Sequence, residues 1–239
     1  MCLRSRKANG ELDRFVYSAS HDLKAPLSTI RGLTTLMEID KETPPQEFIQ
    51  KIKKQTDTME KFIQDVVNYS RNSRTDVKFE WIDICQLIND LHQSFIYYEN
   101  ADKIAFENHV QPGQMVHSDP YRLRVILNNI ISNAFRYSDL SKDKPFIAIS
   151  FQTDPKGQQQ IIVEDNGIGI EQKHLPKLFS MFYRASTVSN GSGLGLYIAM
   201  ESARKINCGL EVHSEYRKGT VFTLIFPRQI AAEAGRLTS

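Results

Sequence analysis

Cysteine is scarce in this sequence, and it has no long apolar run. The 239 residues include only Cys2, Cys85 and Cys208, which are odd in number and too widely spaced for a disulfide framework or a zinc knuckle. No stretch approaches the roughly 18 apolar residues that span a bilayer. The basic N-terminus is not followed by the apolar segment of a secretory signal. These absences lead us to expect a soluble, intracellular protein.

Neither sign of charge is in clear excess. Thirty Lys and Arg residues against 28 Asp and Glu residues give a formal net charge of +2. A non-specific nucleic-acid binder needs a clearly basic face, so we expect no nucleic-acid partner. Hydrophobic residues make up 41% and charged residues 24% of the chain, a composition that excludes disordered and collagen-like proteins.

Glycine is almost absent from residues 11–75, where only Gly32 occurs. Apolar residues recur there every three or four positions, first at Leu12, Val16, Ala19, Leu23, Pro26, Ile30, Leu33 and Met37. A second series follows the helix-breaking Pro44 and Pro45, at Ile49, Ile52, Thr56, Met59, Ile63, Val66 and Ser70. This pattern predicts two helices joined by a short turn. A single hairpin has too little core to be stable, so we expect two chains to form a dimeric four-helix bundle.

The pattern changes to mixed α and β after about residue 76. Alternating apolar residues predict strands at 77–84, 104–110, 146–153, 160–164, 210–214 and 220–226. Helical periodicity appears at 85–98, 120–137 and 194–207. This order favours an α+β sandwich with the sheet in one layer and the helices in the other.

One histidine on the first predicted helix has unusual surroundings. The periodicity places His21 on the outer, solvent-facing side of that helix, with Asp22 beside it. A neutral imidazole nitrogen is a competent nucleophile, and a neighbouring carboxylate can fix its tautomer or accept a proton. Pro26 frees the carbonyl of Asp22 and loosens the helix one turn beyond the histidine.

Three segments of the second half have the chemistry of a nucleotide site. Asn129, Asn133 and Arg136 share one face of a predicted helix, where an amide oxygen suits Mg²⁺ and a guanidinium suits phosphate. Asp165 ends an apolar strand and precedes Gly167 and Gly169, glycines that allow close approach of a flat ligand.

The third segment, residues 191–196, is glycine-rich and opens a helix, a favourable position for phosphate. Its glycines lack the spacing of a dinucleotide fingerprint, and residues 218–220 reverse the order of a P-loop. The H-R-D and D-F-G motifs of eukaryotic protein kinases and the acidic ligands of an EF-hand are also absent.

Together these segments resemble the core of the sensor histidine kinases of two-component signalling, over residues 11–228. Residues 21–27 resemble the family's H-box, 129–137 its N-box, 165–169 and 191–196 its two glycine boxes, and 179–184 its F-box. The resemblance implies a dimerisation and histidine phosphotransfer domain at 11–75. It implies a catalytic ATP-binding domain at 76–228, an α/β sandwich of the GHKL type.

The same resemblance implies roles for individual residues. His21 is expected to accept the phosphoryl group with Asp22 assisting, Asn133 to hold Mg²⁺, and Asp165 to receive the adenine amino group. The implied nucleotide-binding residues are Asn129, Asn133, Arg136, Tyr137, Asp165, Gly167, Gly169, Ile170, Arg184, Gly191, Ser192, Gly193, Leu194, Gly195 and Leu196. The family usually has Thr or Asn where this chain has Ala25, at the side chain thought to orient the water that dephosphorylates the regulator, so the resemblance does not decide whether phosphatase activity is present.

We therefore expect ATP-dependent autophosphorylation of His21 and transfer of the phosphoryl group to an aspartate of a response regulator. The expected cofactors are ATP and Mg²⁺, the expected assembly is a homodimer, and a sensor domain is expected upstream. The expected location is the cytoplasm, either free or as part of a membrane-anchored receptor. A dimeric scaffold that binds nucleotide without transferring phosphate, and an ATPase coupled to conformational change, are the alternatives.

Overall fold

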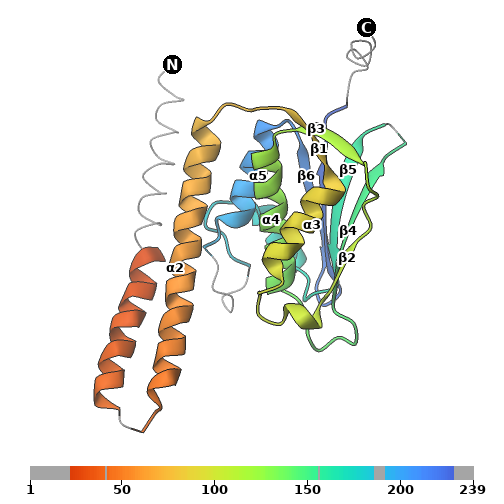
Figure 1. Cartoon of the computed structure of the whole chain (residues 1–239). Coiled ribbons are helices and arrows are strands. Elements are labelled where there is room, and N and C mark those ends of the chain that lie inside the picture. Colours follow the sequence, from red (N-terminus) through yellow and green to blue (C-terminus); the bar gives the residue numbers. More distant parts are fainter. Residues whose placement is uncertain (1–21, 41, 156, 186–191, 229–239) are drawn as a thin grey trace.

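The computed structural model describes residues 22–40, 42–155, 157–185 and 192–228 and shows a helical hairpin beside an α/β domain (Figure 1). The first helix covers residues 22–39 and continues through Pro26, which is buried. The second, α2 (Pro45–Arg74), begins with Pro44 at its N-cap and Pro45 in its first turn, where a missing N–H costs no hydrogen bond. The second predicted helix and the break before it are confirmed, as is the first helix over residues 22–39; its predicted part before residue 22 lies outside the described residues.

The α/β domain is built on a five-stranded sheet in the order β2-β4-β5-β7-β6. Its strands are β2 (Ala105–Asn108), β4 (Phe146–Thr153), β5 (Gln159–Asp165), β6 (Gly209–Glu215) and β7 (Gly219–Ile225). Strands β2 and β4 pair in parallel and the other neighbours are antiparallel. The helices α3 (Ile84–Phe95), α4 (Pro120–Arg136) and α5 (Gly195–Lys205) form a layer beside this sheet (Figure 1). The predicted two-layer α+β arrangement is confirmed.

Two strands and two short helices differ from the sequence prediction. A second sheet pairs β1 (Glu80–Asp83) with β3 (Met115–Ser118), and β3 was not predicted. Strand β1 is also shorter than the predicted 77–84, because only residues 80–83 pair with β3. Two short 3-10 helices, Ala101–Lys103 and Gln172–Lys177, lie outside the predicted strands and helices. Among the described residues, no helix is both long and apolar enough to cross a bilayer.

The hairpin packs against the α/β domain through its second helix. Phe62 of α2, Val125 of α4, and Leu194 and Ile198 at the start of α5 form one buried apolar cluster. Leu23 of the first helix packs against the same cluster. In Figure 1, α2 accordingly runs alongside α5. Burial of these side chains stabilises the contact between the two parts of the chain.

A buried arginine joins the end of α2 to the start of α4. Arg122 is 1% exposed, and its guanidinium donates to the Asp119 carboxylate at 2.7 Å and to the Asn72 side-chain oxygen at 3.0 Å. It also donates to the main-chain oxygens of Asn72 at 3.2 Å and Thr75 at 2.6 Å. Burial would raise the pKa of Asp119, but amide donors and the guanidinium outweigh burial and hold it below the usual value.

We predict that Arg122→Met lowers the free energy of unfolding by about 3 kcal/mol, because it leaves the buried Asp119 carboxylate without its cation. Urea unfolding followed by circular dichroism measures the change. Arg124→Met is the matched control, since Arg124 lies on the same helix but is half-exposed. Its ion pair with Asp90, at 3.6 Å, lies at the surface and contributes little to stability. Equal destabilisation by both variants would contradict this account.

Candidate nucleotide site

A cavity of about 420 Å³ is enclosed by α4, α5, the end of β5 and one side of α2. Most of the residues implied as nucleotide-binding lie in its wall, namely Asn129, Asn133, Arg136, Tyr137, Asp165, Gly169, Ile170, Arg184, Ser192, Gly193, Gly195 and Leu196. Gly167 and Leu194 are buried outside the wall, and Leu194 belongs to the cluster that contacts α2. Asp22 does not line the cavity. His21 and Gly191 lie outside the described residues.

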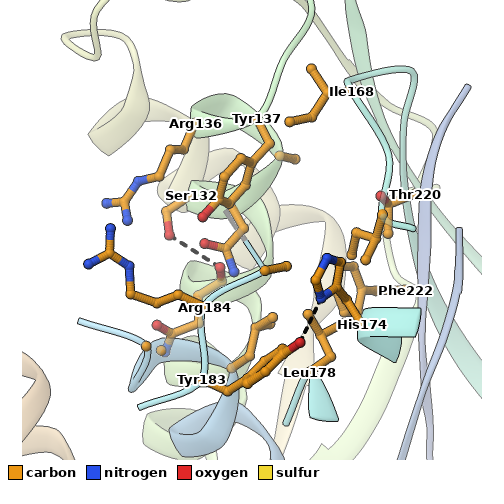
Figure 2. A pocket seen from close by; sticks show the side chains of 18 of the residues that line it. Ser132, Arg136, Tyr137, Ile168, His174, Leu178, Tyr183, Arg184, Thr220 and Phe222 are labelled. Carbon is orange, nitrogen blue, oxygen red and sulfur yellow. Dashed lines mark hydrogen bonds between the residues drawn. The ribbon is translucent and has the colours of Figure 1, made fainter. Parts of the chain in front are cut away.

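Helix α4 supplies the polar face of this cavity. Asn129, Asn133 and Arg136 line it as their spacing predicts, and Arg136 and Arg184 extend their guanidinium groups on the same side (Figure 2). Asn129 donates from Nδ2 to the carbonyl of Val125 at 2.8 Å. Its Oδ1 faces α5, where a Cβ on Gly195 would lie only 2.7 Å away. Gly195 is therefore required for α5 to pack closely against α4.

Asp165 is placed by the end of β5 and held by main-chain donors. Its Oδ1 accepts a hydrogen bond from the amide of Gly167 at 2.8 Å, and the amide of Thr220 on β7 is a second donor. Burial raises the pKa of Asp165 to about 6, and the two amides and the Lys142 ammonium only partly oppose that rise. The carboxylate is thus mainly ionised at neutral pH and available as an acceptor.

Gly169, the second glycine after Asp165, lies against the main chain of another strand rather than beside open space. Gly169 has φ +65°, and a Cβ there would lie 2.0 Å from the carbonyl of Glu215. The sequence interpretation assigned this glycine to close approach by a flat ligand. The structure gives another reason, which is the packing of the loop after β5 against the end of β6.

Lys142 holds that loop in place from the opposite side. Its ammonium donates to the carbonyls of Asn166, Gly167 at 3.2 Å and Lys218 at 3.0 Å. Three carbonyls around one ammonium tie the segment after β5 to the turn between β6 and β7. Lys142 therefore positions the segment that carries Asp165, a role that no sequence motif indicated.

A second polar contact crosses the far side of the cavity. His174 Nδ1 and the hydroxyl of Tyr183 are 2.6 Å apart (Figure 2). This hydrogen bond connects the 3-10 helix at Gln172–Lys177 with the segment that carries Arg184. Up to residue 185 the structure shows this bond and the packing of Phe179 and Leu178 onto the core.

Comparison with known proteins identifies this arrangement. Residues 11–74 match the His Kinase A (phospho-acceptor) domain family. Residues 118–230 match the family described as histidine kinase-, DNA gyrase B-, and HSP90-like ATPase. The two matches occur in the same order as the hairpin and the α/β domain. This chain belongs to the histidine kinases.

Among curated proteins, the kinase is 30% identical over 237 residues to the sensor histidine kinase YkoH of Bacillus subtilis, covering 96% of this chain and 50% of YkoH. It is 29% identical over 224 residues to cyanobacterial phytochrome B of a Nostoc species, covering 90% of this chain and 29% of that protein. The chain thus spans half or less of the length of these relatives.

Solved structures have the same fold. The histidine kinase ThkA, solved in complex with the response regulator protein TrrA, has a TM-score of 0.72 at 19% identity and covers 94% of this chain and 64% of ThkA. The Acinetobacter baumannii histidine kinase AdeS has a TM-score of 0.69 at 19% identity, covering 87% of this chain and 98% of AdeS.

The donor set of the cavity suits Mg²⁺ bound together with phosphate. Mg²⁺ prefers oxygen ligands and is usually held by one or two protein groups plus water and phosphate oxygens. Asn133 offers one amide oxygen in the wall. The described residues contain no group of three or more His, Cys, Asp or Glu side chains that would form an all-protein metal site. The residues present therefore fit an ion that arrives with its nucleotide.

The structure also brings residues into the wall that the sequence motifs did not include. Lys61 and Asp65 come from α2, Glu171 and His174 from the segment after β5, and Tyr216, Thr220 and Phe222 from the β6–β7 hairpin. One feature of the sequence could have pointed to Thr220, because it follows the only glycine between the strands predicted at 210–214 and 220–226. The two α2 residues had none, because their place depends on how the hairpin packs.

We predict a pH-dependent stability difference between the kinase and its Asp165→Asn variant. The pKa of Asp165 is about 6 in the folded state against an ordinary value of 3.8, so ionisation costs folding free energy that grows from pH 4 to pH 6. Replacing the carboxyl removes this cost. Between pH 4 and pH 8, the unfolding free energy of the variant should therefore rise by about 2 kcal/mol relative to that of the parent. Urea unfolding at both pH values measures the shift.

Glu164→Gln removes a neighbouring but exposed carboxylate and serves as the matched control. If the unfolding free energies of Asp165→Asn and the parent differed equally at pH 4 and pH 8, burial would not raise the pKa of Asp165 and the account would be contradicted.

Proposed function

We propose that this chain is an ATP-dependent histidine autokinase that passes its phosphoryl group to an aspartate of a response regulator. The observation that carries the proposal is the cavity. Its wall combines the half-buried carboxylate of Asp165, at the end of β5, with the guanidinium groups of Arg136 and Arg184, which extend on one side (Figure 2). A nucleotide has the complementary arrangement, with an amino-bearing base at one end and phosphates at the other.

In this proposal each side chain acts through its own chemistry. Asp165 accepts a hydrogen bond from the adenine amino group, and its pKa of about 6 keeps it ionised at neutral pH. Arg136 and Arg184 bind phosphate oxygens, and Asn133 supplies the protein ligand for Mg²⁺. When bound, the ion offsets negative charge on the phosphates. Tyr137 lies beside the nucleotide.

The transfer step requires His21 at the phosphate end of the cavity. A ring nitrogen of His21 attacks the γ-phosphorus in line, the bond from that phosphorus to the β,γ-bridging oxygen breaks, and ADP leaves. Asp22 fixes the tautomer of the ring or accepts its proton. The product is phosphohistidine, whose phosphoryl group then passes to a carboxylate oxygen of the regulator.

We further propose that the active form is a homodimer. Apolar side chains of the hairpin are exposed in the single chain, including Leu36 at 52%, Ile39 at 72% and Ile63 at 52%. Helices with such faces bury them against other helices. A second copy of the hairpin offers the same apolar faces and completes a four-helix bundle.

We predict that incubation with γ-labelled ATP and Mg²⁺ labels the parent chain but not His21→Gln. The label should be acid-labile and alkali-stable, as expected for a phosphoramidate. His213→Gln is the matched control, because His213 is an exposed histidine on β6 outside the cavity, and it should label like the parent.

Label that persists in His21→Gln would assign the acceptor to another residue. Nucleotide binding without any labelling of the parent would favour the non-catalytic scaffold.

A further inference from the structure

Two charged side chains from the hairpin lie in the wall of the nucleotide cavity. Lys61 and Asp65 are one helical turn apart on α2, and both line the cavity with Arg136. Asp65 is only 5% exposed, although α2 is otherwise buried at few positions. A buried carboxylate at the edge of a phosphate site needs a physical explanation, because it repels the ligand that the site binds.

Asp65 is held by the segment that leads into α5. Its Oδ2 accepts a hydrogen bond from the hydroxyl of Ser192 at 2.7 Å. The same hydroxyl accepts from the amide of Leu194 at 3.1 Å, just before α5 begins at Gly195. Burial raises the pKa of Asp65, while Ser192, Lys61 and Arg136 oppose that rise. The carboxylate therefore occupies a position at the glycine-rich segment that suits an anion.

Lys61 contributes positive charge to the same end of the cavity. It is half-buried, and burial, with a smaller contribution from Arg136, lowers its pKa to about 8 while Asp65 opposes the change. With Arg184, three cations line this end. Of the other two carboxylates in the wall, Glu171 is paired with Lys173 at 2.7 Å, and Asp165 accepts from the amide of Gly167 at 2.8 Å. The cationic end thus has Asp65 as its own internal counter-ion.

We propose that Lys61 is a phosphate ligand that the hairpin supplies to the nucleotide site, and that Asp65 is the internal anion that the phosphates displace. The proposal rests on the proposed function, since it requires a nucleotide in this cavity. Phosphate oxygens carry more negative charge than one carboxylate, so they compete effectively for Lys61 and Arg136. The phosphates also repel the Asp65 carboxylate, which then leaves its hydrogen bond with Ser192.

The two side chains therefore have opposite effects on nucleotide affinity. Lys61 strengthens binding and Asp65 weakens it, even though they lie on the same helix and against the same domain. Displacement of Asp65 also breaks the hydrogen bond to Ser192, so nucleotide binding loosens the polar contact between α2 and the segment before α5. By linkage, a hairpin that holds Asp65 in place lowers nucleotide affinity to the same extent.

The test measures dissociation constants of a fluorescent ATP analogue with Mg²⁺ for variants of this 239-residue chain. Lys61→Met should weaken binding about ten-fold through loss of one charge-assisted contact, and Lys61→Arg should restore it. Asp65→Asn, which keeps an acceptor for Ser192, should tighten binding about three-fold by removing the competing charge. Lys51→Met and Asp57→Asn change exposed residues of the same helix and should match the parent.

The opposite signs distinguish this proposal from a structural role of α2. The inference would be overturned if the variants at Lys61 and Asp65 shifted affinity in the same direction, or if both matched their controls. In either case the parent would still bind nucleotide, and the proposed function would stand. A parent that binds no nucleotide would overturn the proposed function and this inference with it.

Discussion

The position of the hairpin depends on one buried guanidinium. Arg122 links the last turn of α2 to the cap of α4 through side-chain and main-chain acceptors that lie about 50 residues earlier in the chain. A charge this deeply buried is stable only when all its partners are in place. The tyrosine next to it adds two contacts, since Tyr121 donates to Asn68 at 3.2 Å and lies under Arg71. The end of α2 is thus built into the α/β domain.

This junction determines what surrounds the nucleotide cavity. α2 ends at this junction and runs alongside α5 (Figure 1). Its side chains therefore reach the glycine-rich segment and line the cavity together with those of α4 and β5. The cavity therefore belongs to both parts of the chain. The proposed transfer from a nucleotide in this cavity to a histidine on the hairpin needs such a shared boundary, since the reacting groups must approach within bonding distance.

The elements with strong periodicity and the motif residues on them could be predicted from the sequence. Asn133 and Arg136 share a helical face, and Asp165 ends an apolar strand, so local pattern alone places them. Strand β3 was missed because its four residues pair with β1, more than 30 positions earlier, and short strands have little pattern of their own. Lys61 and Asp65 read as outward-facing residues of a hairpin. They face the cavity because α2 packs on the α/β domain through Arg122 and through the cluster around Phe62, contacts that join residues far apart in the sequence.

Hydrogen–deuterium exchange with and without Mg²⁺ and ATP tests the central claim, that one nucleotide cavity is walled by both parts of the chain. The account predicts changed exchange in α4, in the loop after β5 and in α2 around residues 61–65, where the contact with Ser192 is released. The start of α2, around residues 45–55, should be unchanged. Nucleotide-dependent changes confined to the α/β domain, with none in α2, would contradict the account.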